Sequence, residues 1–182
     1  MAEVKQVRLG GFGGQGVVLA GILLGEAGVI DGKQVSGSNS YGAQARGSAC
    51  KAEIVLADGP IDFPHLVTAD ILVAMSQGTY DLYGGDVKAS SGVILYEQGL
   101  VTIKEDLNVH QVGIPASEYA IKRLNNKQVA NIVLLGALVE TTRVVSSPAV
   151  QKAIRTHVGK RFQALNLKAF RIGIDLGRRV HG

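Results

Sequence analysis

The distribution of apolar and polar residues predicts strands and helices that alternate along the chain. Two short segments, 70–75 and 92–96, are apolar throughout and bounded by turn residues, which is typical of parallel strands buried on both faces. We therefore expect both in the centre of a sheet. Segment 49–57 alternates apolar and polar positions, which predicts a strand with one covered face at a sheet edge. Further strands are expected at 4–9, 33–36 and 109–114.

Longer segments with helical spacing lie between these strands. Helices are predicted at 14–29, 79–83, 128–142 and 165–176, and Pro115 should open another. Ser147 can cap a further helix that has Pro148 at its first position and, at four-residue spacing, Val150, Ile154, Val158 and Phe162. Segment 37–47 is predicted to be a loop. The pattern predicts an α/β fold, a single Rossmann-like domain over 1–182 with a mostly parallel sheet flanked by helices.

Composition narrows the class of protein. Apolar residues make up 46% and charged residues 19% of the 182 positions, which is a globular balance. The N-terminal segment lacks an export signal, and no apolar segment approaches the roughly 20 residues that cross a bilayer, so we expect a cytoplasmic protein without membrane contact. The chain has a single cysteine, Cys50, which excludes an internal disulfide and cannot by itself hold an iron–sulfur cluster. We expect Cys50 to be a small residue of the core.

Charge is distributed unevenly. From Arg143 to the end the chain carries nine Lys or Arg and one acid, whereas the preceding residues carry ten and fourteen. This basic segment fits solvated helix faces, an acidic partner or a phosphate. Nucleic acid is disfavoured, because only Phe162 and Phe170 offer rings for base stacking there.

A glycine-rich turn is the main candidate for a binding site. Gly11, Gly13 and Gly16 form a G-x-G-x-x-G match directly after the first predicted strand. Residues without side chains let the backbone turn sharply and let a pyrophosphate approach, while the helix N-terminus faces the anion. The candidate cofactor-binding residues of this turn are Gly11, Phe12, Gly13, Gly14, Gln15 and Gly16. The alternative is a turn whose glycines serve only tight packing.

A nicotinamide dinucleotide is disfavoured as the ligand. Such sites place an acid near the end of the second strand, where it holds the ribose. Here segment 35–38 has no acid, and Asp31 lies in the turn before the strand. No arginine is placed to bind the 2′-phosphate of NADP. A phosphate ligand with a different sugar contact, such as coenzyme A, remains open.

A second loop, 40–47, is expected at the carboxyl end of the second strand, where ligands bind in such sheets. Arg46 can form two hydrogen bonds with a carboxylate or phosphate. Tyr41 can pack against a ligand and donate one hydrogen bond through its hydroxyl. An arginine that only pins the loop is an equal alternative. We include Tyr41 and Arg46 among the candidate cofactor-binding residues.

These motifs together resemble the gamma subunit of 2-oxoacid:ferredoxin oxidoreductases, most closely the 2-oxoglutarate members. The family's G-x-G-G-Q-G turn matches residues 11–16, its Y-G-x-E-x-R-G-G-like loop matches 41–48, and an asparagine before an L-G-A-L helix matches Asn131 before 135–138. Two positions depart from the family pattern. Gln44 stands where an acid is usual, and Ser48 replaces the second glycine, so any role of that acid does not carry over.

The resemblance implies that the chain is one component, inactive alone and without catalytic residues, of an enzyme built from several chains. Such enzymes convert a 2-oxoacid and coenzyme A to acyl-CoA (succinyl-CoA from 2-oxoglutarate) and CO2, and reduce ferredoxin. Thiamine diphosphate, Mg²⁺ and iron–sulfur clusters are implied in alpha, beta and ferredoxin-like delta partners. Coenzyme A is implied in a shared site, with its phosphates near Gly13, Gly14 and Gln15. A pyruvate or branched-chain 2-oxoacid member and a purely structural assembly subunit remain alternatives.

Other chemistry lacks support in the sequence. The histidines are scattered without a nearby acid cluster, so no metal site is expected. No G-x-S-x-G elbow is present, which disfavours a hydrolase. An independent nucleotide-dependent oxidoreductase stays open as the enzyme-class alternative, on the strength of the glycine turn.

Overall fold

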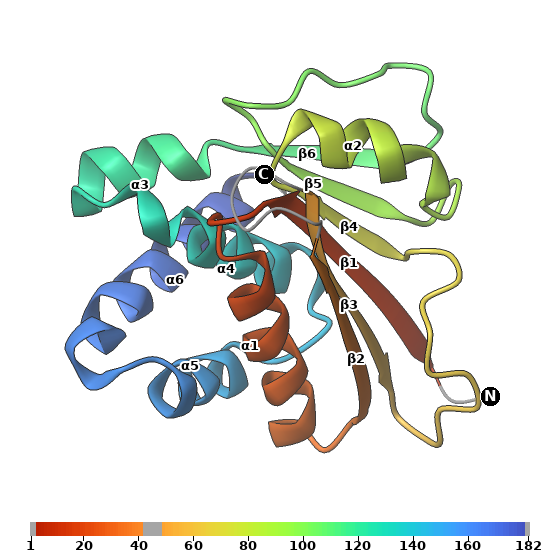
Figure 1. Ribbon diagram of the computed structural model, residues 1–182, viewed down its shortest axis with the longest axis horizontal. Coiled ribbons are helices and arrows are strands. Elements are labelled where there is room, and N and C mark those ends of the chain that lie inside the picture. The colour runs from red at the N-terminus through yellow and green to blue at the C-terminus, as the bar shows by residue number, and fades with distance from the viewer. Residues whose placement is uncertain (1–2, 42–48, 181–182) are drawn as a thin grey trace.

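The computed structural model describes residues 3–41 and 49–180. Six strands form one sheet in the order β2-β3-β1-β4-β5-β6 (Figure 1). The strands are β1 (Val4–Phe12), β2 (Gln34–Tyr41), β3 (Ala49–Ala57), β4 (Ile71–Ala74), β5 (Val93–Glu97) and β6 (His110–Ile114). The α-helices are α1 (Val17–Ile30), α2 (Gln77–Tyr83), α3 (Ala116–Leu124), α4 (Ala130–Thr142), α5 (Ser147–His157) and α6 (Lys160–Val180), with 3₁₀ turns η1 (Gly84–Asp86) and η2 (Lys127–Val129).

The sheet is mostly parallel, as predicted. Strands β1, β4, β5 and β6 pair in parallel, and β4 and β5 are interior strands. The edge prediction for segment 49–57 is wrong, because β3 runs antiparallel between β1 and β2, and β2 forms the edge. Its polar positions suggested a solvent-exposed face. In the structure two of them, Lys51 and Glu53, are instead partly covered and paired with each other.

Strand β2 is longer than predicted. It continues to Tyr41, through half of the predicted loop 37–47, because its backbone pairs with β3 from Gln34↔Ala57 to Tyr41↔Cys50. Ser, Gly and Asn side chains do not favour strands, so sequence propensity alone misses this extension. The rest of the loop, 42–48, lies outside the described residues.

Helices cover both faces of the sheet (Figure 1). The main core lies on the side of α1, α4, α5 and α6, and it includes Cys50, as expected. A smaller cluster on the other face packs Leu72 and Ile94 beneath Tyr80 of α2. Among the described residues, no helix combines the length and apolar character needed to span a bilayer.

The two C-terminal helices differ from their predicted boundaries. Ser146, rather than Ser147, caps α5, since its hydroxyl accepts a hydrogen bond from the Ala149 amide. Helix α5 ends at His157, because Val158 adopts an extended conformation. Phe162 therefore belongs to α6, where it is exposed rather than part of the predicted apolar stripe.

Helix α4 is buried on every side, from Asn131 to Val139. Its backbone meets that of α6 directly. A Cβ atom added to Gly136 would collide with the Phe170 carbonyl oxygen, and one added to Gly173 with the Val133 carbonyl oxygen. Both positions therefore require glycine for close approach, and this contact fixes how far α4 lies from α6.

The substitution Gly173→Ala should lower the free energy of unfolding by about 3 kcal/mol, because the clash is with backbone atoms that cannot rotate away. Urea denaturation of the purified chain measures the change. Gly85→Ala is the matched control, since its added Cβ meets no atom within 4 Å, and its effect should stay within about 0.5 kcal/mol. Equal effects of the two substitutions would contradict the proposed close contact.

Candidate functional site

The glycine-rich turn begins later than predicted, because β1 runs on to Phe12 rather than ending at 9. Its ladder with β3 extends to the pair Phe12↔Ala49. Gly11 is therefore a strand residue, and its missing side chain makes room for the Gln15 side chain and for Met75. The turn proper consists of residues 13–16, and α1 follows at Val17 rather than at the predicted position 14.

Gln15 ties the turn to two strands. Its Oε1 accepts a hydrogen bond from the Phe12 amide at 2.6 Å, and its Nε2 donates to the Met75 carbonyl at 2.9 Å. Met75 directly follows β4, so the side chain bridges the ends of β1 and β4. Both polar ends of this side chain are thus used within the chain.

Asn131 holds the other end of the turn. Gly16 has φ 74°, a left-handed conformation that favours glycine, and its carbonyl accepts from Asn131 Nδ2 at 3.0 Å. Because a carbonyl can only accept, this bond fixes the orientation of the Asn131 amide. Its Oδ1 is buried and has no hydrogen-bond partner among the described residues. A buried acceptor without a donor is costly, and such atoms occur where a ligand or water supplies the donor.

A cavity of about 180 Å³ lies beside the turn, at the carboxyl ends of β4 and β5. Its wall includes Gly14, Gln15, Met75, Glu97, Leu100, Ser117 and Asn131. Glu97 is only 2% exposed, and its carboxylate accepts hydrogen bonds from both the amide and the hydroxyl of Ser117. Acceptor atoms on Glu97 and Asn131 suit a group with N–H or O–H donors. Lys127 adds one cation to the same lining.

A second cavity, of about 270 Å³, lies on the α2 side of the turn. It is lined among others by Gly11, Phe12, Tyr41, Lys51 and Thr79. Helix α1 leaves β1 toward one face of the sheet, whereas α2 leaves β4 toward the other (Figure 1). This crevice is therefore the switch point at which α/β sheets bind ligands.

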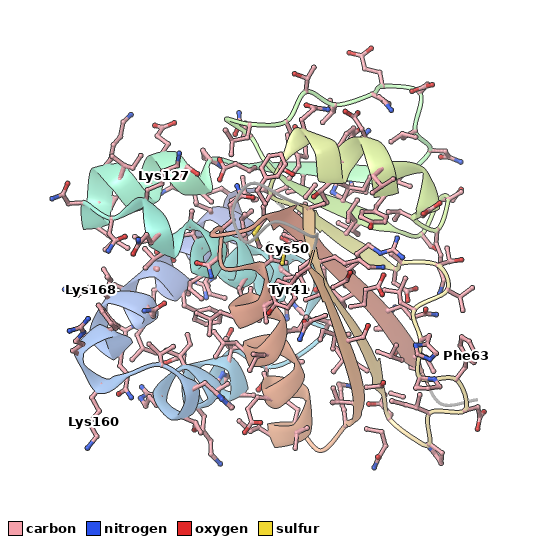
Figure 2. The ribbon with its side chains drawn as sticks, viewed as in Figure 1. Tyr41, Cys50, Phe63, Lys127, Lys160 and Lys168 are labelled. Carbon is pink, nitrogen blue, oxygen red and sulfur yellow. The ribbon has the colours of Figure 1, made fainter. Side chains whose placement is uncertain are left out.

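Tyr41 lies at this crevice, as the last residue of β2 and 67% exposed. Figure 2 shows it close to Cys50, its partner in the β3 register. Burial raises the pKa of the Cys50 thiol, which disfavours the reactive thiolate. Arg46, the other predicted loop residue, lies outside the described residues.

A charged cluster adjoins the second cavity. Arg8 Nε donates to Glu53 at 2.8 Å, and its guanidinium lies 4.3 Å from the centre of the Tyr83 ring. Lys51 also donates to Glu53, at 2.9 Å. Burial alone would raise the pKa of Glu53, but hydrogen bonds and charge from Lys51 and Arg8 outweigh it and hold this pKa below its ordinary value.

Sequence reasoning thus found the turn but missed part of its surroundings. Asn131 was noted only as part of a motif, and its contact with Gly16 spans 115 positions. Glu97 and Lys51 carried no spacing signal, because each is a single charged residue on a strand. Within the described residues, no group of His, Cys, Asp or Glu is arranged to hold a metal ion.

The strand order gives a physical reason against a dinucleotide site. In the Rossmann arrangement β2 lies beside β1, so an acid at its end reaches the ribose. Here β3 is inserted between them, which moves the end of β2 about 5 Å further from the turn.

Fold and site together define a doubly wound α/β protein with a glycine turn at its switch point. The family model for pyruvate ferredoxin/flavodoxin oxidoreductase matches residues 6–176. The chain belongs to this family, and the predicted resemblance is confirmed.

Individual relatives narrow the comparison. The chain is 42% identical over 179 residues to the 2-oxoglutarate synthase subunit KorC of Methanocaldococcus jannaschii, covering 97% of this chain and 95% of the relative. The crystal structure of a keto/oxoacid ferredoxin oxidoreductase gamma subunit from Geobacter sulfurreducens matches with a TM-score of 0.88 and 38% identity, over 98% of both chains.

The fold also occurs inside a larger chain. The 2-oxoglutarate:ferredoxin oxidoreductase from Magnetococcus marinus, solved with 2-oxoglutarate, coenzyme A and succinyl-CoA bound, matches with a TM-score of 0.87. The match covers 97% of this chain but 31% of that chain, at 22% identity. At this identity the likeness shows the shared fold.

We expect Glu53→Gln to lower the free energy of unfolding at pH 7 by about 2 kcal/mol, because the buried Arg8 then keeps only its longer ion pair with Asp86, at 3.6 Å. The contribution of the carboxylate is complete above the ordinary pKa of 4.5 and is lost as the pH falls through the lowered pKa of the folded state. The difference in the free energy of unfolding between the wild type and Glu53→Gln should therefore decrease as the pH falls. Denaturant titrations between pH 7 and 3 measure this difference.

Glu118→Gln provides the control for this prediction. Glu118 forms an exposed ion pair with Lys122 at i,i+4, so its loss should cost no more than about 0.5 kcal/mol. A gap for Glu53→Gln that stays constant with pH would show that the carboxylate charge contributes nothing.

Proposed function

We propose that this chain is the gamma subunit of a 2-oxoglutarate:ferredoxin oxidoreductase and forms part of its coenzyme A site. The main support is its full-length similarity to a 2-oxoglutarate synthase subunit, together with the unsatisfied acceptor beside the glycine turn. The enzyme would convert 2-oxoglutarate and coenzyme A to succinyl-CoA and CO2 and pass the electrons to ferredoxin. The alpha, beta and delta subunits would hold thiamine diphosphate, Mg²⁺ and the iron–sulfur clusters.

Coenzyme A fits the two cavities in chemically distinct ways. Its arm carries amide N–H donors, which match the acceptors of Asn131 and Glu97 beside the turn. Its phosphates would lie at the glycine turn, which adjoins both cavities, near the backbone amides of Gly13 and Gly14 and the first turn of α1. Lys51 in the lining of the second cavity is a further cation, although Glu53 already pairs with it. Gln15 would shape the turn for the phosphates, because its side chain is bonded to Phe12 and Met75 and its backbone amide donates to the Phe12 carbonyl at 3.1 Å.

The predicted loop residues complete this assignment. Exposed Tyr41 and Phe12 at the crevice offer aromatic surface for the adenine base. Arg46 would pair with a phosphate. When bound, coenzyme A supplies the thiol that takes the acyl group. The residues of this chain bind and orient it, and they exclude water from the cavity beside Asn131.

Purification of the tagged chain from its native cells tests membership in the complex. We expect other subunits to co-purify and the eluate to oxidise 2-oxoglutarate with a low-potential acceptor only when coenzyme A is present. Isolated chain should be inactive. Faster turnover of pyruvate or a branched-chain 2-oxoacid than of 2-oxoglutarate would show that the proposed substrate is wrong. A chain that purifies alone and binds NAD(H) would overturn the whole proposal.

Kinetics of variant complexes test the coenzyme A site. Asn131→Ala should raise the KM for coenzyme A about tenfold, the value of one hydrogen bond, and Arg46→Ala about 30-fold, as for a charged one. The KM for 2-oxoglutarate should not change. Arg155→Ala, an exposed cation on α5, is the control and should leave both values unchanged. Intact complexes with unaltered coenzyme A kinetics in every variant would instead support a purely structural assembly subunit.

A further inference from the structure

A groove with a basic rim runs between α3 and α6, away from the glycine turn. Its cavity of about 370 Å³ is lined by Tyr119, Arg123, Leu124, Lys168, Arg171, Ile172, Asp175, Leu176 and Arg179. Its floor is apolar, formed by Leu124, Ile172 and Leu176. Four cations and one acid surround this floor. The combination calls for an occupant that is both apolar and anionic.

The cations of this groove are not neutralised by the chain itself. Arg123, Lys168 and Arg171 form no ion pair with any residue in 3–41 or 49–180. Arg179 donates a hydrogen bond to the Tyr119 hydroxyl at 3.2 Å. This hydroxyl is uncharged, so it does not neutralise the arginine. The single acid, Asp175, lies 3.7 Å from Arg178, outside the groove lining. The positive charge is therefore available to a partner.

The spacing of the cations indicates an extended occupant. Lys168, Arg171 and Arg179 lie at i, i+3 and i+11, on one side of α6, and so span roughly 16 Å along the helix axis. A single phosphate is too small to meet both ends. Figure 2 shows Lys168 on the outer side of α6, well separated from Lys160 at the start of the same helix.

Two other classes of partner fit less well. A helix that lies on a membrane exposes a continuous apolar face, whereas the apolar face of α6 is already packed on α4, and only Leu124 and Ile172 of the groove floor stay partly exposed. Single-stranded nucleic acid needs free aromatic rings for stacking, and the one ring in the groove, Tyr119, is held by Arg179.

We infer that the groove between α3 and α6 binds an acidic amphipathic segment of another subunit of the same enzyme. Apolar side chains of that segment pack on Leu124 and Ile172, which are partly exposed, and its carboxylates pair with the surrounding cations. This inference rests on the proposed function, because it requires a complex with other subunits.

Zero-length carbodiimide coupling of the purified complex tests the chemistry directly, since it joins a lysine amine to a carboxylate in contact with it. Lys168 is the one lysine of the groove. We expect mass spectrometry to find Lys168 joined to an Asp or Glu of another subunit, and Lys160 not joined. Coupling of Lys168 only to Asp175, or equal coupling of Lys160 and Lys168 to other subunits, would overturn the inference.

Charge reversal in the groove provides a second test of this inference. Lys168→Glu with Arg171→Glu should weaken retention of the partner subunit at least tenfold, whereas Lys160→Glu with Arg161→Glu, on the same helix outside the groove, should not. Thermal unfolding of both variants checks that each folds. Reversal of the coupled partner carboxylate to lysine should restore retention to the groove variant.

The outcomes separate this inference from the proposed function. If the wild-type chain purifies without other subunits, the proposed function and the inference both fall. If it purifies with them and the groove variant is retained equally well, only the inference falls. Binding of the chain to anionic vesicles or RNA that the groove reversal abolishes, without loss of subunits, would also overturn it.

Discussion

Direct backbone contact between α4 and α6 is the constraint on which the rest of the structure depends. Gly136 and Gly173 let the two helices approach closely, and α4 is thereby fixed in the middle of the protein with every side covered. Because the helix cannot slide or rotate, its second residue, Asn131, is held under Gly16. The position of the glycine turn is therefore set by a helix that lies more than a hundred residues later in the chain.

The antiparallel insertion of β3 has the next largest consequence. It separates β2 from β1, so the place where dinucleotide-binding folds put their ribose acid no longer adjoins the turn. The start of β3 instead brings Lys51 to the crevice that Tyr41 of β2 also lines. One change in strand order thus removes the ribose-binding acid from beside the glycine turn, and this disfavours a dinucleotide.

The parts of the structure that depend on local pattern could be predicted from the sequence. The central strands β4 and β5 and the glycine turn follow from apolar runs and spacing, and each is present. The wrong predictions concern features that depend on contacts with residues far away in the sequence. Strand β2 extends to Tyr41 only because β3 pairs with it. The alternating polar positions of β3 predicted an edge strand, but Lys51 and Glu53 pair with each other and so are accommodated on an interior strand. The unsatisfied Oδ1 of Asn131 likewise becomes visible only when Gly16 is placed beside it.

The two groups of charges in this chain differ in a way that follows from solvation. Arg8 is almost fully buried, and its loss of water must be offset within the chain, which Glu53, Asp86 and the Tyr83 ring provide. Lys168 and Arg171 remain hydrated, so the chain folds although neither forms an ion pair within the described residues. Their excess charge adds nothing to folding and persists on one face of α6. A partner that buries the apolar floor of the groove would desolvate these cations in turn, and it must then carry carboxylates, because the one acid of the groove, Asp175, pairs with Arg178 instead.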